Sequence, residues 1–203
     1  MLEDIIKERF KKLSEIQQVG LDPYPARTKR TITLAEARNK FAALSRSRRR
    51  VSLAGRISGS RDQGGVFFLD LKDETGGIQV VLKKDALPKF DFWKSVLDIG
   101  DFISVSGLLF KTKRGEESIE AKEIQILAKS LRPLPSDWYG LEEVETRLRK
   151  RYLDLLANAE AKEIFRKKAI FWQTFRDFLL KEKFLEVETP VLEAIPGGAE
   201  AEP

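Results

Sequence analysis

Three side chains suited to nucleic-acid binding occupy matching positions on three consecutive predicted strands. Arg56, Phe68 and Gln79 alternate with apolar residues that we expect to fill a core, so all three are expected to face outward. An outward aromatic ring can stack on a nucleobase, a glutamine amide can read a base edge, and an arginine can meet phosphate or a base. Alternation alone leaves a second interpretation open, in which Phe68 packs beneath a neighbouring segment such as the N-terminal helices.

The composition excludes several kinds of catalysis. The 203 residues include no His and no Cys, so the chain has no imidazole base, no thiolate nucleophile and no cysteine-based zinc site. The 37 Lys and Arg against 32 Asp and Glu give a net charge of +5, which suits a phosphate-rich partner but is also common among ordinary proteins. No signal peptide and no apolar stretch of membrane-spanning length is visible, and we expect a cytoplasmic protein without a membrane segment.

The elements that must position the three residues form a predicted β-meander that continues into a barrel. Five alternating segments are expected to be strands: 51–58, 67–72, 78–82, 101–110 and 117–127. A short helix at 90–97 separates the third strand from the fourth, and this order is that of an OB-fold barrel. The apolar parity changes within the fifth strand, which predicts a bulge near Lys122 and Glu123.

Helical patterns flank the barrel and complete an α+β chain. Before it, helices are predicted at 2–17 and 33–44, the second opened by a capping box of Thr33 and Glu36. After it come a proline-stiffened linker, a helical pattern at 142–156, a long helix at 161–183 and a strand at 184–191. The apolar residues of the long helix cover more than one stripe, which indicates burial on two sides.

These elements suggest four parts of the chain. They are an N-terminal helical extension at 1–50, the barrel domain at 51–130, a linker and helix at 131–160, and the start of a second domain at 161–203. The last residues read as an exposed loop with nothing after it to pack against, so we expect the second domain to be truncated.

Four short segments make the chain resemble the bacterial-type class II lysyl-tRNA synthetases. They are Leu-Arg-Pro-Leu-Pro at 131–135, Arg-Tyr-Leu-Asp-Leu-Leu at 151–156, Phe-Leu-Glu-Val-Glu-Thr-Pro at 184–190 and Ile-Pro-Gly-Gly-Ala at 195–199. The resemblance covers essentially the whole chain. The Glu-Val-Glu-Thr-Pro portion is shared with the aspartyl and asparaginyl enzymes, whereas the first two segments favour the lysine enzyme.

The resemblance implies that the barrel binds the uracil-rich anticodon of tRNA-Lys. It assigns anticodon contacts to Arg56, Phe68, Gln79 and Glu123, with Phe68 stacking on a base. Two basic groups are then candidates for phosphate contacts, a non-specific and salt-sensitive contribution to binding. They are Arg46, Arg48, Arg49 and Arg50, and Lys111, Lys113 and Arg114.

The resemblance also assigns roles to the second domain. The segment 161–191 resembles motif 1, which forms the homodimer interface in class II synthetases, here with Phe171, Phe175, Phe178 and Pro190. The alternative is that these apolar residues pack as ordinary core against the rest of the catalytic domain. The loop residues Gly197, Gly198 and Ala199 resemble the lining of the lysine pocket. Glu202 stands where the family often has a basic residue, so its role is left open.

The resemblance implies that the full-length enzyme uses ATP and Mg²⁺ to activate lysine and transfer it to tRNA. The family's ATP-binding arginines and magnesium-binding acids belong to motifs 2 and 3, which are not in these 203 residues. We therefore expect no catalytic residue and no metal ligand in this chain, and no activity of the chain alone. A non-catalytic OB-fold module for single-stranded RNA, with an appended helical dimerisation segment, is the alternative.

Overall fold

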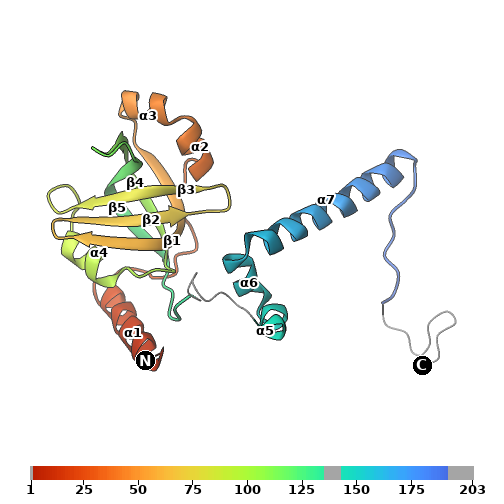
Figure 1. Ribbon diagram of the computed structural model, residues 1–203, viewed down its shortest axis with the longest axis horizontal. Helices are drawn as coiled ribbons and strands as arrows, with labels where there is room; N and C mark the ends of the chain where they lie inside the picture. Colours follow the sequence, from red (N-terminus) through yellow and green to blue (C-terminus); the bar gives the residue numbers. More distant parts are fainter. Residues whose placement is uncertain (1, 135–142, 192–203) are drawn as a thin grey trace. The chain divides into compact units, whose positions relative to one another are not determined.

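A computed structural model describes residues 2–134 and 143–191, and the chain divides into two compact units, residues 1–134 and 135–203 (Figure 1). The first unit holds the N-terminal helices and all the described strands. The second unit is helical where it is described. The loop predicted to line a lysine pocket, Gly197, Gly198 and Ala199, lies outside the described residues, as does Glu202.

The first unit is built on a closed five-stranded barrel with the strand order β1-β2-β3-β5-β4. The strands are β1 (Val51–Gln63), β2 (Val66–Lys72), β3 (Gly77–Lys83), β4 (Phe102–Lys111) and β5 (Glu117–Ala128). The pairing of β3 with β5 is parallel and the other pairings are antiparallel. The helix α4 (Phe90–Val96) joins β3 to β4. The predicted OB-fold is therefore confirmed.

The barrel core consists of the inward-facing residues of the predicted alternation. Leu53, Ile57, Leu69, Val80 and other members of these sets are buried inside the barrel. Burying an apolar side chain of this size contributes about 1.5–3 kcal/mol. A one-residue slip of any strand would turn its apolar set outward, so the pattern fixes which side chains face solvent.

The predicted bulge on β5 is present. Glu123 pairs with Ser106 and Ala121 pairs with Gly107, so Lys122 is the extra residue between them. The neighbouring strand approaches closely at this point, because a Cβ atom on Gly107 would overlap the carbonyl oxygen of Glu120. Glycine is therefore required where the two strands bend together.

The N-terminal helices are α1 (Leu2–Gln18), α2 (Leu34–Asn39) and α3 (Phe41–Ser47). The capping box of Thr33 and Glu36 is formed, and the carboxylate of Asp73 accepts a further hydrogen bond from the Leu34 amide at 3.1 Å. The prediction of one helix over 33–44 is wrong, because the backbone leaves helical geometry at Lys40 and a second short helix begins there.

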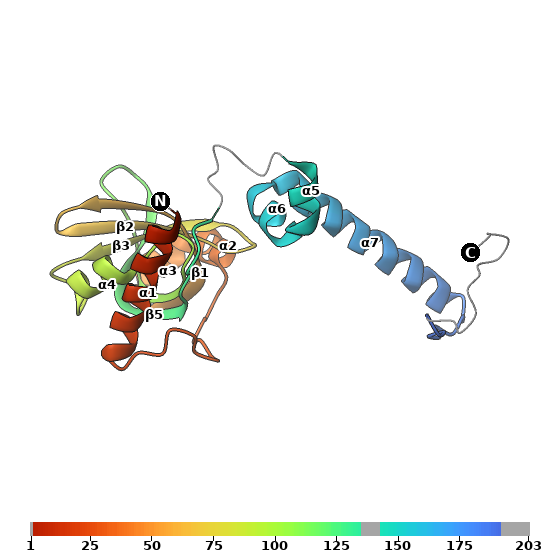
Figure 2. The ribbon, with the colours of Figure 1, turned by 90° about the horizontal axis from the view of Figure 1, so that it is seen from below.

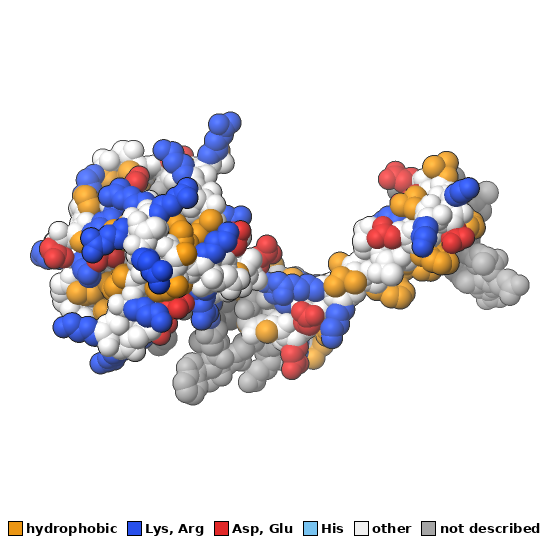
Figure 3. Space-filling model, turned by 90° about the horizontal axis from the view of Figure 1, so that it is seen from above, with side chains coloured by type: hydrophobic (Ala, Val, Ile, Leu, Met, Phe, Trp, Pro, Cys, Tyr) orange, Lys and Arg blue, Asp and Glu red, His pale blue; other side chains and the backbone are white. Residues whose placement is uncertain are grey.

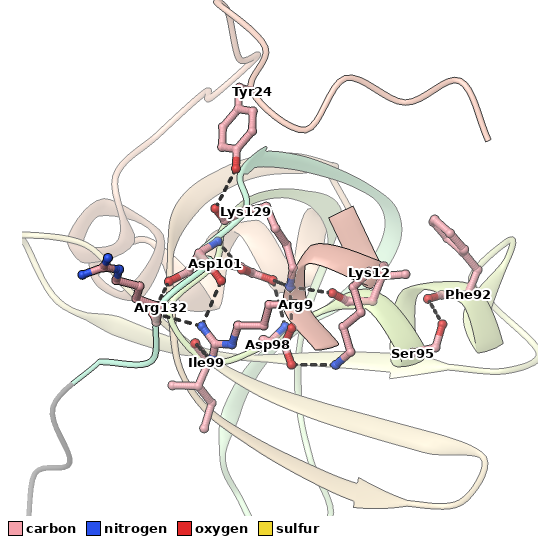
Figure 4. A network of polar contacts seen from close by, with 12 residues as sticks. Arg9, Lys12, Tyr24, Phe92, Ser95, Asp98, Ile99, Asp101, Lys129 and Arg132 are labelled. Atoms are coloured by element: carbon pink, nitrogen blue, oxygen red, sulfur yellow. Dashed lines mark hydrogen bonds and ion pairs between the residues drawn. The ribbon is translucent and has the colours of Figure 1, made fainter. Parts of the chain in front are cut away.

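A buried polar network fastens α1, which packs beside α4, to the end of the barrel (Figures 2 and 4). The side chain of Lys129 is 0% exposed, and its ammonium donates to Asp98 at 2.5 Å and Asp101 at 2.8 Å. Lys12 of α1 binds the other oxygen of Asp98 at 2.7 Å. Arg9 donates to the carbonyl oxygens of residues 99, 130 and 132. The buried charges of this network are thus paired, as burial requires.

The second unit contains α5 (Val144–Arg149), α6 (Arg151–Ala157) and α7 (Ala159–Lys181). The side chain of Asn158 accepts hydrogen bonds from the first amides of α7 and so caps it. The carboxylate of Asp154 is buried between Arg147 at 2.8 Å and Arg151 at 2.5 Å. The hydrogen bond from Arg147 makes the largest contribution to lowering the pKa of Asp154. The ion pair between Arg147 and Asp154 thus joins α5 to α6.

The aromatic side chains of α7 are exposed in the described part of the chain. Phe171, Phe175 and Phe178 are 62%, 52% and 59% exposed. The predicted strand at 184–191 is not formed, and Pro190 lies in an irregular segment. A strand needs a neighbour to pair its backbone groups, and the described residues of this unit provide none. No helix of the described residues is long and apolar enough to cross a membrane.

Candidate nucleic-acid interface

A groove of about 1140 Å³ extends over the outer faces of β2 and β3 to the turn between β4 and β5. Outward residues of the two strands line it, among them Phe68, Gln79 and Lys83. Residues 110–114 and Glu116 line it from the turn. No described residue of the N-terminal helices lines the groove, so Phe68 is not covered by them.

Phe68 lies in the middle of β2, directly opposite Arg61 on β1 and Val81 on β3. Its two chain neighbours, Phe67 and Leu69, point into the core and are buried. Phe68 itself is half-buried and borders the groove. A partly exposed ring held by a rigid strand is a suitable platform for a stacked base.

Gln79 lies on β3 beside Asp70 of β2 and Ser118 of β5. The hydroxyl of Ser118 lies 3.0 Å from Oε1 of Gln79, and the amide borders the groove. A base edge in the groove would therefore meet a hydrogen-bonding amide whose position is fixed by two neighbouring strands.

Positive charge dominates the described lining of the groove. The cationic side chains there are Arg61, Lys72, Lys83, Lys111, Lys113 and Arg114, and the carboxylates are Asp70 and Glu116. Figure 3 shows how widely Lys and Arg side chains are spread over one face of the barrel unit. An excess of positive charge beside an aromatic platform suits a phosphate backbone with unstacked bases.

Several of these charges are held in place by neighbours. Arg61 forms an ion pair with Asp70 at 3.1 Å, and Lys83 pairs with Glu120 at 2.5 Å. Hydrogen bonds from Lys122 and then Lys83 lower the pKa of Glu120, so that carboxylate stays charged near neutral pH. Lys83 also lies 5.2 Å from the centre of the Phe110 ring, which makes Phe110 a second aromatic residue of the groove.

Arg56 does not belong to this groove. It lies opposite Lys72, four residues along β2 from Phe68, and its guanidinium sits 4.2 Å above the ring of Phe102. Burial lowers the pKa of this guanidinium. Arg56 is therefore not among the residues that line the groove with Phe68 and Gln79, although its cross-strand partner Lys72 is, and its predicted anticodon contact stays a prediction.

Glu123 is also not among the residues that line the groove. It is exposed on β5 opposite Ser106 of β4, beyond the bulge, whereas Glu116 at the β4–β5 turn borders the groove. Sequence reasoning missed Glu116, Arg61 and Phe110. Parity signals Phe110, which alternates with the buried residues of β4, but Arg61 follows a register shift between Ile57 and Gly59 that parity does not reveal.

The two basic groups occupy different places. Lys111, Lys113 and Arg114 are exposed on the β4–β5 turn and line the groove. The other group is exposed from the end of α3 to the start of β1 and does not line it. Its members are Arg46, Arg48, Arg49 and Arg50. The geometry therefore favours the turn as the source of phosphate contacts close to the groove.

The described residues contain no cluster of carboxylates of the size that would hold a metal ion by protein ligands alone. Among residues 2–134 and 143–191, no group of three or more Asp, Glu, His or Cys side chains is placed to hold a metal ion.

Comparison with known sequence families assigns both units. Residues 51–134 match the family described as the OB-fold nucleic acid binding domain, and residues 143–203 match the class II tRNA synthetases of the D, K and N group. The two matches thus relate the barrel unit to OB-fold nucleic acid binding domains and the helical unit to class II tRNA synthetases.

Comparison with individual proteins indicates which tRNA synthetases the chain resembles. The chain is 39% identical over 209 residues to a lysine–tRNA ligase of Thermotoga maritima, and the match spans 100% of this chain and 42% of that protein. It is 44% identical over 198 residues to lysine–tRNA ligase 2 of Methanosarcina acetivorans, spanning 96% of this chain and 39% of that protein. Along its whole length the chain thus resembles the N-terminal part of lysine–tRNA ligases, and it spans about 40% of their length.

Proposed function

We propose that this chain is the tRNA-binding part of a lysine–tRNA ligase, and that the groove on its barrel receives the anticodon loop of tRNA-Lys. The observation that carries the proposal is the groove itself. It combines Phe68, Gln79 and an excess of positive charge on an OB-fold barrel. The whole length of the chain is similar to the N-terminal part of lysine–tRNA ligases.

Each part of the groove has a distinct task in this proposal. Phe68 stacks on one unpaired base, and Gln79 reads the edge of a base with its amide. Arg61, opposite Phe68, and Glu116 on the turn are placed to make further polar contacts to the loop. The basic turn meets phosphates, which adds affinity without sequence preference.

The activity of the whole protein is the second part of the proposal. Lysine is activated with ATP to lysyl-adenylate, with Mg²⁺ stabilising phosphate charge, and is then transferred to the 3′ end of tRNA-Lys. The described residues supply tRNA binding rather than this chemistry, so we expect the 203-residue chain to form no lysyl-adenylate. Gly197, Gly198 and Ala199 are proposed to line the lysine pocket.

We further propose a cytoplasmic homodimer. The exposed aromatic face of α7 supports the dimer, because monomeric soluble proteins rarely leave so many large apolar side chains in one place. Phe171, Phe175 and Phe178 would be covered by a second copy, with Pro190 in the segment that follows.

The test is binding of labelled RNA stem-loops to the purified chain, followed by fluorescence anisotropy. We expect tighter binding to a stem-loop with the UUU anticodon than to the same stem carrying a guanosine- and cytidine-rich anticodon. Equal binding to both would favour the alternative, a general module for single-stranded RNA. Formation of lysyl-adenylate by the chain would contradict the assignment of the chemistry to residues outside it.

A further inference from the structure

We propose that Ser118 is a specificity-determining residue of the groove, because it orients the Gln79 amide so that its NH₂ group faces the RNA. The inference rests on the proposed function. It assigns the choice between classes of nucleobase to a buried serine that does not itself border the groove.

The contact between the two side chains is fixed by the sheet. Ser118 on β5 and Gln79 on β3 are partners in the parallel pairing that closes the barrel, and the serine is 0% exposed. Its hydroxyl lies 3.0 Å from Oε1 of Gln79 and 3.3 Å from the carbonyl oxygen of Glu116. A hydroxyl has one proton to donate, and the shorter contact is to the glutamine.

This hydrogen bond decides what the amide shows to a ligand. An amide has an acceptor oxygen with two lone pairs and an NH₂ group with two donors, and the hydroxyl bond turns the oxygen toward Ser118. The NH₂ group is left for the groove, where it would seek a carbonyl acceptor. Uracil and guanine present exocyclic carbonyl oxygens at the position where cytosine and adenine present amino groups. The geometry therefore selects keto bases over amino bases.

The opposite orientation of the Gln79 amide would reverse the base preference of the groove. If the hydroxyl donated to the carbonyl of Glu116, its oxygen would accept from the Gln79 NH₂ group, and the amide oxygen would face the groove. The groove would then favour an amino base. The base preference therefore reports which of the two orientations Ser118 imposes.

The experiment measures the affinity of the full 203-residue chain for the UUU stem-loop and for three versions with one U→C change each. Uridine and cytidine have similar shapes but opposite donors and acceptors on the edge concerned. We expect the wild-type chain to prefer uridine by about tenfold at one of the three positions. Ser118→Ala should reduce this ratio to about threefold or less, mainly by weakening the uridine loop, because the freed amide can turn either way.

Two further variants separate a specific role from a structural one. Gln79→Ala should abolish the ratio, and adding Ser118→Ala to it should change nothing further, because the serine acts through the glutamine. Ser104→Ala is the matched control, since it removes a buried hydroxyl that pairs with Ser52 at 3.2 Å and should keep the wild-type ratio. Circular dichroism checks that each barrel is folded.

The outcomes distinguish this inference from the proposed function. A folded Ser118→Ala chain with the wild-type ratio, or a wild-type preference for cytidine, would overturn the inference while loop binding stands. Failure of the wild-type chain to bind any stem-loop would instead overturn the proposed function. If Ser118→Ala does not fold, Ser118→Val also removes the hydroxyl and suits a strand, and an unchanged ratio in that variant would overturn the inference.

Discussion

Arg61 on β1 lies directly opposite Phe68 on β2, and both side chains border the same groove. Arg56 lies on the same strand but is engaged with Phe102 away from it. We therefore expect Arg61→Ala to weaken binding of the UUU stem-loop by about tenfold, which corresponds to one charged hydrogen bond. Arg56→Ala is the matched control and should change the affinity by less than about twofold. A larger effect of Arg56→Ala than of Arg61→Ala would contradict the role given to Arg61 and place the main arginine contact beside Lys72.

Phe68 is predicted to stack on a base rather than to support the barrel. Phe68→Ala should cost about 1–3 kcal/mol of RNA-binding free energy, and Phe68→Trp should retain most of the affinity because it keeps a flat ring. The measurement is fluorescence anisotropy with the same stem-loop. Phe10→Ala removes an aromatic ring that is exposed on α1 outside the groove and should leave binding unchanged. Unaltered affinity of the Phe68→Ala chain would indicate that the ring only packs.

The basic turn is predicted to supply the salt-dependent part of binding. Changing Lys111, Lys113 and Arg114 to Ser should make the slope of log affinity against log salt concentration less steep. The slope should change by about 0.7 for each phosphate that the turn no longer neutralises. The preference for UUU over other anticodons should persist, because phosphate contacts carry no sequence information. Serine substitutions at Arg48, Arg49 and Arg50, which lie outside the groove, are the control. A larger effect of the control substitutions would indicate that the RNA phosphates contact the residues at the end of α3 instead.

Sequence periodicity predicts the barrel well, because a closed sheet with one buried face imposes a period of two that Leu53, Leu69 and Val80 follow. Periodicity misses the break at Lys40, where the backbone leaves helical geometry although the apolar spacing continues. It also predicts a strand at 184–191 that has no partner among the described residues.

The site is harder to predict than the fold, because parity tells which face a residue occupies but not which neighbours it meets. Parity identifies Phe68 and Gln79, and both line the groove. Arg56 has the same parity but contacts the Phe102 ring rather than lining the groove, while Arg61 follows a shift in register. The hydroxyl of Ser118 reaches Gln79 only through a pairing of strands 39 residues apart in the sequence.

The polar network that joins α1 to the barrel predicts acid sensitivity. Burial acts to raise the pKa of Asp98, but hydrogen bonds from Lys12 and Lys129 outweigh it, and the pKa lies below the ordinary value of 3.8. A lowered folded-state pKa gives stability that is present above the unfolded pKa and is lost as pH falls through the folded one. The urea concentration at the midpoint of unfolding should therefore decrease as the pH drops below about 4. This decrease should be smaller in Asp98→Asn. An equal fall in both chains would contradict the prediction.

The aromatic face of α7 is predicted to mediate self-association. Sedimentation of the chain should show a dimer, and changing Phe171, Phe175 and Phe178 to Ser should shift it to monomer while RNA binding is retained. Serine at Lys167, Lys168 and Lys181, polar positions of the same helix, should leave the dimer intact. A monomeric wild-type chain would contradict the proposed interface.

The most direct test of the groove as the anticodon site is photo-crosslinking of a UUU stem-loop that carries 4-thiouridine at each anticodon position in turn. Mass spectrometry then identifies the crosslinked residues in the full chain. We expect crosslinks within β2, β3 and the 110–116 turn, with Phe68 and its neighbours among them. Crosslinks confined to α3, to the Arg56 side of the barrel or to α7 would contradict the assignment of the groove.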